Sequence, residues 1–327
     1  MRIVVTGGSG FIGSNFLRFM IEKYPEYGFV NIDKLTYSGN KENLFDLENK
    51  ENYQFFQEDI CDRKAIGNIL KEGDVLVNFA AESHVDNSIL NPGIFIQTNV
   101  LGTQSLLDTA REKKAKLFIQ ISTDEVYGSL GFDQESSSED HLLVPSSPYS
   151  ASKAAAELLC VACMKTFNQP IIITRSSNNF GPYQFPEKVI PLFVTNLLKD
   201  KKVPLYGEGK NVRDWIYVQD NCEAIDFIIH KGNVGEIYNI GGSNELQNIE
   251  LTKEILKQMG KDESHIEHVE DRLGHDLRYS VNTKKIEDLG WKPRFDFQGA
   301  LAESIEWYKN NESWWGPLKN TPNRRTS

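Results

Sequence analysis

The glycine-rich segment Val4–Gly13 constrains the fold of this chain more than any other stretch. It lies between an apolar strand-like run and an amphipathic helical pattern. At such a junction Gly7 allows a tight turn, Gly10 lets the backbone approach a pyrophosphate, and Gly13 lets the helix pack close to the strand. The N–H groups at the start of the helix can then bind phosphate. The segment therefore predicts a dinucleotide site where the first strand meets the first helix.

An acidic residue at the end of the next apolar run supports this interpretation. Asp33 follows Gly13 by 20 residues, the position from which a carboxylate accepts hydrogen bonds from the adenosine ribose hydroxyls. A carboxylate there also repels a 2′-phosphate, which favours NAD over NADP, although the positive charge of Lys34 stands beside it. We expect Asp59–Ile60 to meet the adenine, and the small residues Ala80–Ala81 to lie where the dinucleotide crosses the sheet.

Short apolar runs alternate with amphipathic stretches through the first half of the chain. This alternation predicts an α/β fold, a doubly wound (Rossmann) parallel sheet with helices on both faces. The strand-like runs are Ile3–Thr6, Phe29–Ile32, Tyr53–Gln57, Val75–Phe79, Leu117–Ser122 and Ile171–Thr174, and the helical stretches include Phe11–Tyr24, Thr98–Lys113 and Ala151–Phe167.

The alternation of strand-like and helical stretches becomes less regular beyond Asn178, where Gly181-Pro182 and Phe185-Pro186 interrupt it. We expect residues 1–177 to form an NAD-binding domain and residues 178–327 to form mainly a smaller C-terminal α/β lobe that binds the substrate. A segment near residues 215–240 is expected to return to the first domain.

Composition and charge exclude several classes of protein. The 327 residues include 46 acidic and 36 basic side chains, and the net charge of −10 disfavours nucleic-acid binding. No apolar run approaches the ~18 residues of a membrane span, and the N-terminus lacks the layout of a signal peptide. Four cysteines in a chain of this length do not make a disulfide framework, and Cys160 and Cys163 are expected to pack in the core. We therefore expect a cytoplasmic protein without a metal site.

A tyrosine and a lysine four residues apart, Tyr149 and Lys153, stand at the start of a predicted helix. This spacing places them on the same face. A nearby ammonium favours the phenolate, so we expect Lys153 to lower the pKa of Tyr149 from about 10. Tyr149 would then act as the base for a hydroxyl whose carbon gives up a hydride.

Together, the glycine-rich start and the Tyr149/Lys153 pair resemble the extended short-chain dehydrogenase/reductase family, and the resemblance covers essentially the whole chain. Within it, Asp124 and Glu125 stand side by side where many relatives have small residues. Adjacent carboxyls in the cleft of Tyr149 suggest an acid and a base for removing water. Further stretches resemble the family of dTDP-glucose 4,6-dehydratases: Ala81–Asp86, Ser177–Tyr183, Phe185–Lys188, Arg213–Trp215 and Asp271–His275.

The resemblance implies an NAD-dependent lyase that converts dTDP-glucose to dTDP-4-keto-6-deoxy-glucose and water. Tyr149 is expected to take the proton of the 4-hydroxyl, and Thr123 to hydrogen-bond the 4-oxygen. Glu125 is expected to remove the proton on carbon 5, and Asp124, with a raised pKa, to protonate the departing 6-hydroxyl. The hydride taken by NAD returns to the same sugar, so NAD is expected to stay bound.

The resemblance also implies a homodimer, formed through the helices Thr98–Lys113 and Ala151–Phe167, and a place in deoxysugar (for example rhamnose) biosynthesis. The expected catalytic residues are Thr123, Asp124, Glu125, Tyr149 and Lys153. The expected cofactor-binding residues are Gly7, Gly10, Phe11, Ile12, Gly13, Asp33, Lys34, Ser38, Gly39, Asp59, Ile60, Ala80, Ala81, Ser83, Thr98, Tyr149, Lys153 and Asn178. The expected substrate-binding residues are Ser83, Thr123, Asn178, Lys188, Pro204, Tyr206, Arg213, Asn248, Asp271, Arg272 and His275.

Two alternatives stay open at this point. The chain could be a dehydratase or 4-epimerase of another nucleotide sugar, such as UDP- or CDP-glucose, because no sequence rule here separates the bases. It could also be a non-catalytic NAD-sensing protein on the same fold, although such a protein would not need all five catalytic side chains. In addition, Leu273 stands where the family usually has proline, so we expect a looser loop there.

Overall fold

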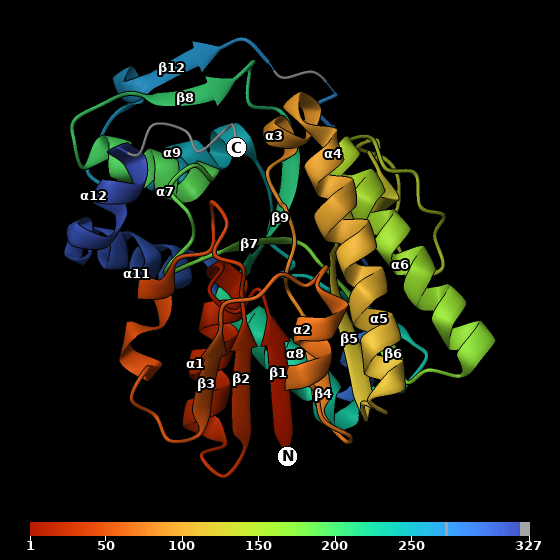
Figure 1. Cartoon of the computed structure of the whole chain (residues 1–327). Coiled ribbons are helices and arrows are strands. Elements are labelled where there is room, and N and C mark those ends of the chain that lie inside the picture. Colours follow the sequence, from red (N-terminus) through yellow and green to blue (C-terminus); the bar gives the residue numbers. More distant parts are fainter. Residues whose placement is uncertain (272–273, 321–327) are drawn as a thin grey trace.

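The computed structural model describes residues 1–271 and 274–320, and within them a seven-stranded parallel sheet forms the centre of the molecule (Figure 1). Its strands are β1 (Arg2–Thr6), β2 (Gly28–Ile32), β3 (Tyr53–Phe56), β4 (Val75–Asn78), β5 (Leu117–Thr123), β6 (Ile171–Ser176) and β10 (Ile237–Ile240). They lie in the order β10-β6-β5-β4-β1-β2-β3. The predicted Rossmann sheet is confirmed.

Both faces of this sheet are buried, because consecutive residues of each strand point to opposite sides. On β1, Ile3 and Val5 belong to one hydrophobic core, which α1 (Phe11–Lys23) and α8 (Val218–Lys231) share. Val4 belongs to a second core on the other face, together with α2 (Arg63–Ile69), α5 (Thr103–Glu112) and α6 (Pro148–Phe167). Near-continuous Val, Ile and Leu in the strands follow from this double burial.

A smaller lobe covers the edge of the sheet at which the parallel strands end, above the sheet in Figure 1. It contains the three-stranded sheet β11-β9-β7 and the two-stranded sheet β12-β8. Its strands are β7 (Asn178–Phe180), β8 (Val203–Tyr206), β9 (Val212–Tyr217), β11 (Glu245–Gln247) and β12 (Ile266–Val269). Its helices are α7 (Val189–Leu197), α9 (Asn248–Gln258), α11 (Phe297–Asn310) and α12 (Glu312–Asn320), whereas α10 (Lys284–Leu289) packs against β10 of the central sheet.

Two helix boundaries differ from the prediction. α6 begins at Pro148, three residues before the predicted start, because Ser147 caps it and accepts a hydrogen bond from the Ser150 N–H. The single helix expected over Thr98–Lys113 is a π-helical segment, Ile96–Gly102, followed by α5. Short helices α3 (Val85–Leu90) and α4 (Pro92–Phe95) precede it. No helix in the described part of the chain is long and apolar enough to cross a bilayer.

A buried ion pair fixes α6 against the sheet. Arg175 on β6 donates from Nε and Nη2 to both carboxylate oxygens of Glu157 on α6, with Nη2 to Oε2 at 2.7 Å. Arg175 and Glu157 are 3% and 1% exposed. Arg175 also donates to the Tyr127 hydroxyl at 2.7 Å. The pair therefore joins α6, which carries Tyr149, to the strand beside β5.

Replacing Glu157 with alanine should lower the free energy of unfolding by about 3–5 kcal/mol, because it leaves the Arg175 guanidinium buried without its partner. Chemical denaturation of wild type and variant measures the difference. Asp288→Ala is the control, since it breaks the exposed Lys284–Asp288 pair and should cost less than about 1 kcal/mol. Equal losses in the two variants would contradict a special role for the Arg175–Glu157 pair.

Candidate active site

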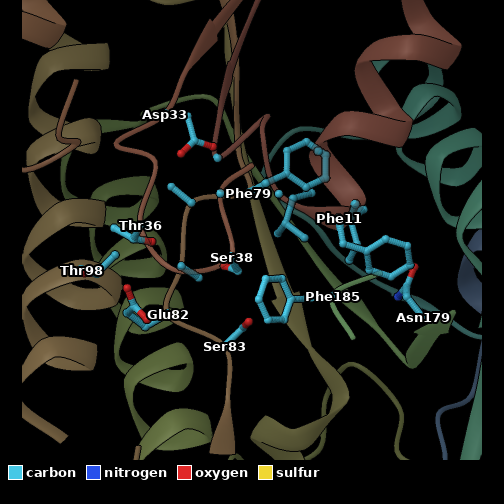
Figure 2. A pocket seen from close by; sticks show the side chains of 18 of the residues that line it. Phe11, Asp33, Thr36, Ser38, Phe79, Glu82, Ser83, Thr98, Asn179 and Phe185 are labelled. Carbon is cyan, nitrogen blue, oxygen red and sulfur yellow. The ribbon is translucent and has the colours of Figure 1, made fainter. Parts of the chain in front are cut away.

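A pocket opens beyond the carboxyl ends of the central strands, where ligands of parallel α/β sheets bind. Figure 2 shows side chains from both halves of the chain around it, with Asp33, Thr36 and Ser38 on one side and Asn179 and Phe185 on another. Every residue predicted to be catalytic lines the pocket, and so does every residue predicted to bind the cofactor. The structure thus brings these two predicted sets together in one place.

The glycine-rich loop has the shape that a bound pyrophosphate requires. Gly7 has φ +71°, a conformation that L side chains rarely adopt. A Cβ on Gly13 would lie 2.5 Å from the Gly7 carbonyl oxygen, so only glycine lets α1 begin this close to β1. Gly10 stands at the N-cap of α1, where backbone N–H groups and the helix dipole favour an anion. These residues fit the phosphates of a dinucleotide.

Asp33, at the end of β2, also holds the loop in place. Its Oδ2 accepts a hydrogen bond from the Ser9 N–H at 2.9 Å, and its Oδ1 accepts one from the Leu35 N–H at 2.8 Å. Burial raises the pKa of Asp33, and the two N–H donors oppose this shift. The ammonium group of Lys34 pairs with Asp59 and not with Asp33, because its Nζ lies 2.7 Å from Asp59 Oδ2. Lys34 is thus engaged with the carboxylate of Asp59 in this structure.

Two adjacent carboxyls follow β5 at the floor of the pocket. Thr123 caps the short helix Asp124–Tyr127, and its Oγ1 accepts a hydrogen bond from the Glu125 N–H at 3.3 Å. Asp124 is 3% exposed. Burial raises its pKa well above the usual range, and the charges of Glu125 and Asp214 raise it further, whereas Arg213 lowers it. Burial and the neighbouring carboxylates therefore favour the protonated form of Asp124, the direction predicted for an acid.

The position of one Asp124 oxygen suits this role. Its Oδ2 atom is buried and makes no hydrogen bond with any residue of the described chain. A protonated carboxyl in that position keeps its proton for a ligand in the pocket.

The prediction that Lys153 lowers the pKa of Tyr149 is wrong for this structure. Burial raises the pKa of the Tyr149 phenol above its usual value, and the nearby carboxylates of Glu125 and Asp124 raise it further. A hydrogen bond with Thr123 opposes this shift. Lys153 instead donates from Nζ to the Ile121 carbonyl at 2.6 Å, and burial lowers its own pKa to about 8.

A hydrogen-bonded chain that the sequence did not predict connects the pocket wall to the Tyr149 helix. Asn99, in the π-helical segment, accepts from the Glu82 N–H at 2.8 Å and donates from Nδ2 to the Glu82 carbonyl at 3.0 Å. The same Nδ2 donates to Ser152 Oγ at 2.8 Å, and Ser152 Oγ donates to the Tyr149 carbonyl at 2.7 Å. Glu82 itself is buried in the pocket (Figure 2). Only its place in the stretch Ala81–Asp86 pointed to it.

The predicted substrate-binding residues fall into two groups. Ser83, Thr123, Asn178 and Lys188 line the pocket. Lys188, which precedes α7, donates from Nζ to the Ser83 carbonyl at 3.1 Å. The Oδ1 atom of Asn178 is buried without a hydrogen-bond partner in the described chain, so a ligand in the pocket can donate to it.

The second group lies in the lobe, outside the residues that line the pocket. Tyr206 on β8 packs its ring edge against the His275 ring, with 6.0 Å between centroids, and Asp271 Oδ1 lies 2.6 Å from His275 Nδ1. Other members of this group are Pro204 on β8, Arg213 on β9 and Asn248 at the start of α9. Arg272 and the unusual Leu273 lie outside the described residues.

Arg213, predicted to bind the diphosphate, lies on β9 of the lobe, within electrostatic reach of Asp124. Its guanidinium donates to the carbonyls of Val212 at 2.7 Å and Asp276 at 3.0 Å, and lies 4.2 Å from the centroid of the Tyr279 ring. Its charge acts on Asp124. In the described residues, no cluster of three or more His, Cys, Asp or Glu side chains could hold a metal ion.

Comparisons with known proteins agree on a family. The family model described as GDP-mannose 4,6 dehydratase matches residues 4–304. A dTDP-glucose 4,6-dehydratase from Streptomyces niveus is 46% identical, over 98% of this chain and 96% of that protein. The crystal structure of a dTDP-glucose 4,6-dehydratase from Streptomyces venezuelae with NAD bound superposes with a TM-score of 0.94 at 46% identity, and covers 97% of this chain and 100% of that one.

A more distant relative has a related but different activity. The UDP-glucose 4-epimerase from Thermotoga maritima has a TM-score of 0.87 at 28% identity, over 95% of this chain and 99% of that one. The higher identity lies with the dehydratases. The chain therefore belongs to the dTDP-glucose 4,6-dehydratase family, within the extended short-chain dehydrogenases/reductases.

Proposed function

We propose that this protein converts dTDP-glucose to dTDP-4-keto-6-deoxy-glucose and water, with tightly bound NAD as its cofactor. The observation that carries this proposal is the pairing of Asp124, a buried carboxyl whose pKa is raised, with Glu125 in the same pocket as Tyr149. An epimerase needs only to oxidise and reduce carbon 4. A second acid–base pair beside the tyrosine suits the removal of water.

Each catalytic side chain has one task in this proposal. Tyr149, hydrogen-bonded with Thr123, accepts the proton of the sugar 4-hydroxyl as the phenolate, a form that the positive charge of a bound nicotinamide ring would favour. Glu125 removes the proton on carbon 5, which the new 4-ketone acidifies, and Asp124 donates its proton to the departing 6-hydroxyl. Glu125 then returns a proton to carbon 5 as carbon 6 accepts the hydride. Lys153 holds the turn of α6 against β5 through the Ile121 carbonyl. The glycine-rich loop and Asp33 would hold NAD, which would supply the acceptor for the hydride of carbon 4 and the donor of that hydride to carbon 6.

Different parts of the chain hold the two ligands in this proposal. Residues 1–177, together with α8 and β10, hold the cofactor on the glycine-rich loop and Asp33. Residues from 178 onward hold the sugar nucleotide, with Asn178 and Lys188 in the pocket and Arg213 beside the catalytic carboxyls. The product would serve deoxysugar synthesis.

Tyr149→Phe should lower kcat by about 10²–10⁴-fold and leave KM nearly unchanged, because the phenol acts only as the hydride leaves. Steady-state assays with dTDP-glucose measure both constants. Tyr238→Phe is the matched control, since it removes a buried hydroxyl that accepts a hydrogen bond from the Asn233 N–H at 2.9 Å outside the pocket. Wild-type turnover by Tyr149→Phe would refute the assignment.

Asp124→Asn and Glu125→Gln should each stop the reaction after oxidation of the sugar. Reduced cofactor should accumulate on the enzyme, visible by its absorbance, while 4-keto-6-deoxy product forms about 10²–10⁴-fold more slowly. Glu125→Gln should also stop solvent deuterium from entering carbon 5, whereas Asp124→Asn should allow some exchange. If both variants make product at near wild-type rate with dTDP-glucose, the two carboxyls are not the elimination pair. Parallel assays with UDP-glucose and CDP-glucose test which nucleotide base the enzyme prefers.

We also propose a homodimer formed through the helical face of α3 to α6. Large apolar side chains are exposed there, with Leu90 73%, Leu101 51% and Leu158 60% accessible. Exposed apolar patches of this kind mark protein–protein contacts. A cytoplasmic location is our further proposal, and it is supported by four cysteines that are all free thiols.

Leu158→Glu should convert the dimer to a monomer, because it places a charge in the proposed interface. Light scattering coupled to size-exclusion chromatography measures the mass. Val234→Glu is the control, since Val234 is similarly exposed, at 57%, but lies near β10, away from this face. A wild-type protein that runs as a monomer at micromolar concentration would contradict the proposal.

A further inference from the structure

The C-terminal helix α12 reaches back to the glycine-rich loop near the start of the chain. Trp314 on α12 donates from Nε1 to Asn43 Oδ1 at 2.8 Å. Asn43 in turn donates from Nδ2 to the Ser9 carbonyl at 2.9 Å. Trp314, Asn43 and Ser9 are 8%, 1% and 1% exposed. Two buried hydrogen bonds therefore connect residue 314 to the centre of the predicted phosphate loop.

Ser9 is the residue of the loop whose orientation these bonds control. Its N–H donates to Asp33 Oδ2, and its Oγ accepts from Asn31 Nδ2 at 3.2 Å. Its carbonyl accepts from the Asn43 side chain and from the Asn40 N–H at 3.0 Å. Because the peptide unit is planar, fixing the Ser9 carbonyl also fixes the Gly10 N–H, at the point where α1 begins.

The other side of α12 is attached to the lobe. Lys319 donates from Nζ to Thr195 Oγ1 at 2.8 Å and to Asn196 Oδ1 at 2.6 Å, both on α7. The Trp314 ring packs edge-on against Tyr183, with 5.7 Å between centroids, and against Trp307 at 5.1 Å. In Figure 1, α12 lies beside α7 and α11. The helix therefore bridges the substrate-binding lobe and the glycine-rich loop.

We propose that Trp314 is a positioning residue for the cofactor, which acts through Asn43 and Ser9 to keep the phosphate loop in its binding geometry. The retention of NAD then depends on the docking of α12. This inference rests on the proposed function, because it takes NAD to be the ligand of the pocket.

The neighbouring tryptophan provides a matched comparison. Trp315 is 2% exposed, and its Nε1 donates to the Tyr308 carbonyl at 2.7 Å. Both tryptophans are thus buried and each makes one indole hydrogen bond, but the bond of Trp315 stays within α11 and α12. Trp314 lines the pocket, whereas Trp315 is not among the described residues that line it.

The experiment compares the exchange of bound NAD for isotope-labelled NAD in wild type, Trp314→Phe and Trp315→Phe, with thermal unfolding of each protein. Trp314→Phe should exchange NAD about two- to tenfold faster, the factor expected for one buried hydrogen bond. Trp315→Phe should exchange NAD at the wild-type rate, although its unfolding temperature should fall by about as much as that of Trp314→Phe. Equal exchange rates in wild type and Trp314→Phe, or equal acceleration in both variants, would overturn the inference.

A second variant separates positioning from direct contact with NAD. Asn43→Leu removes both hydrogen bonds of the relay, so it should accelerate exchange by itself, and adding Trp314→Phe should have little further effect. If Trp314→Phe retains its full effect in the Asn43→Leu background, Trp314 acts by touching NAD and the relay is wrong. Failure of the wild-type protein to bind any NAD would instead refute the proposed function.

Discussion

The parallel direction of the central strands is the constraint on which the site depends. Because every strand ends at the same edge, the residues that follow them meet there although they are far apart in sequence. Gly7 follows β1, Asp33 follows β2, Ala80 lies just beyond β4, Thr123 ends β5 and Ser177 follows β6, and all five line one pocket. Chemistry encoded in separate stretches is thus assembled at one edge of the sheet.

The features that the sequence predicted well depend on local physics. A strand buried on both faces must be apolar along its length, so the six strands predicted in the first half were recognisable within a few residues. The glycine-rich loop was predictable because its backbone needs residues without a Cβ, as the contact between a Gly13 Cβ and the Gly7 carbonyl demonstrates. The raised pKa of Asp124, which burial causes first and the adjacent Glu125 second, was predicted because two adjacent carboxyls with opposite tasks need separated pKa values.

Other features could not be predicted from the sequence, because they depend on which groups far apart in the chain pack together. The environment of Tyr149 is set by burial and by the carboxylates after β5, and these outweigh the lysine four residues away. The bonds of Arg213 to backbone carbonyls, and its stacking on Tyr279, depend on how β9 meets residues 276–279. The contact between Trp314 and Asn43 spans 271 positions of sequence. No periodicity or spacing reports contacts of this range.

The π-helical segment Ile96–Gly102 restricts where residues can be inserted into the chain or deleted from it. Its wider turn lets the Asn99 amide reach both backbone groups of Glu82 as well as Ser152, and its last residue, Gly102, lies so close to Ile60 that a Cβ would approach to 2.5 Å. Removing one residue would restore a regular helix and rotate everything before the deletion by about 100°. An insertion or deletion in this segment would therefore disconnect the pocket wall at Glu82 from the helix that carries Tyr149, so the number of residues between them is fixed by the hydrogen bonds of Asn99.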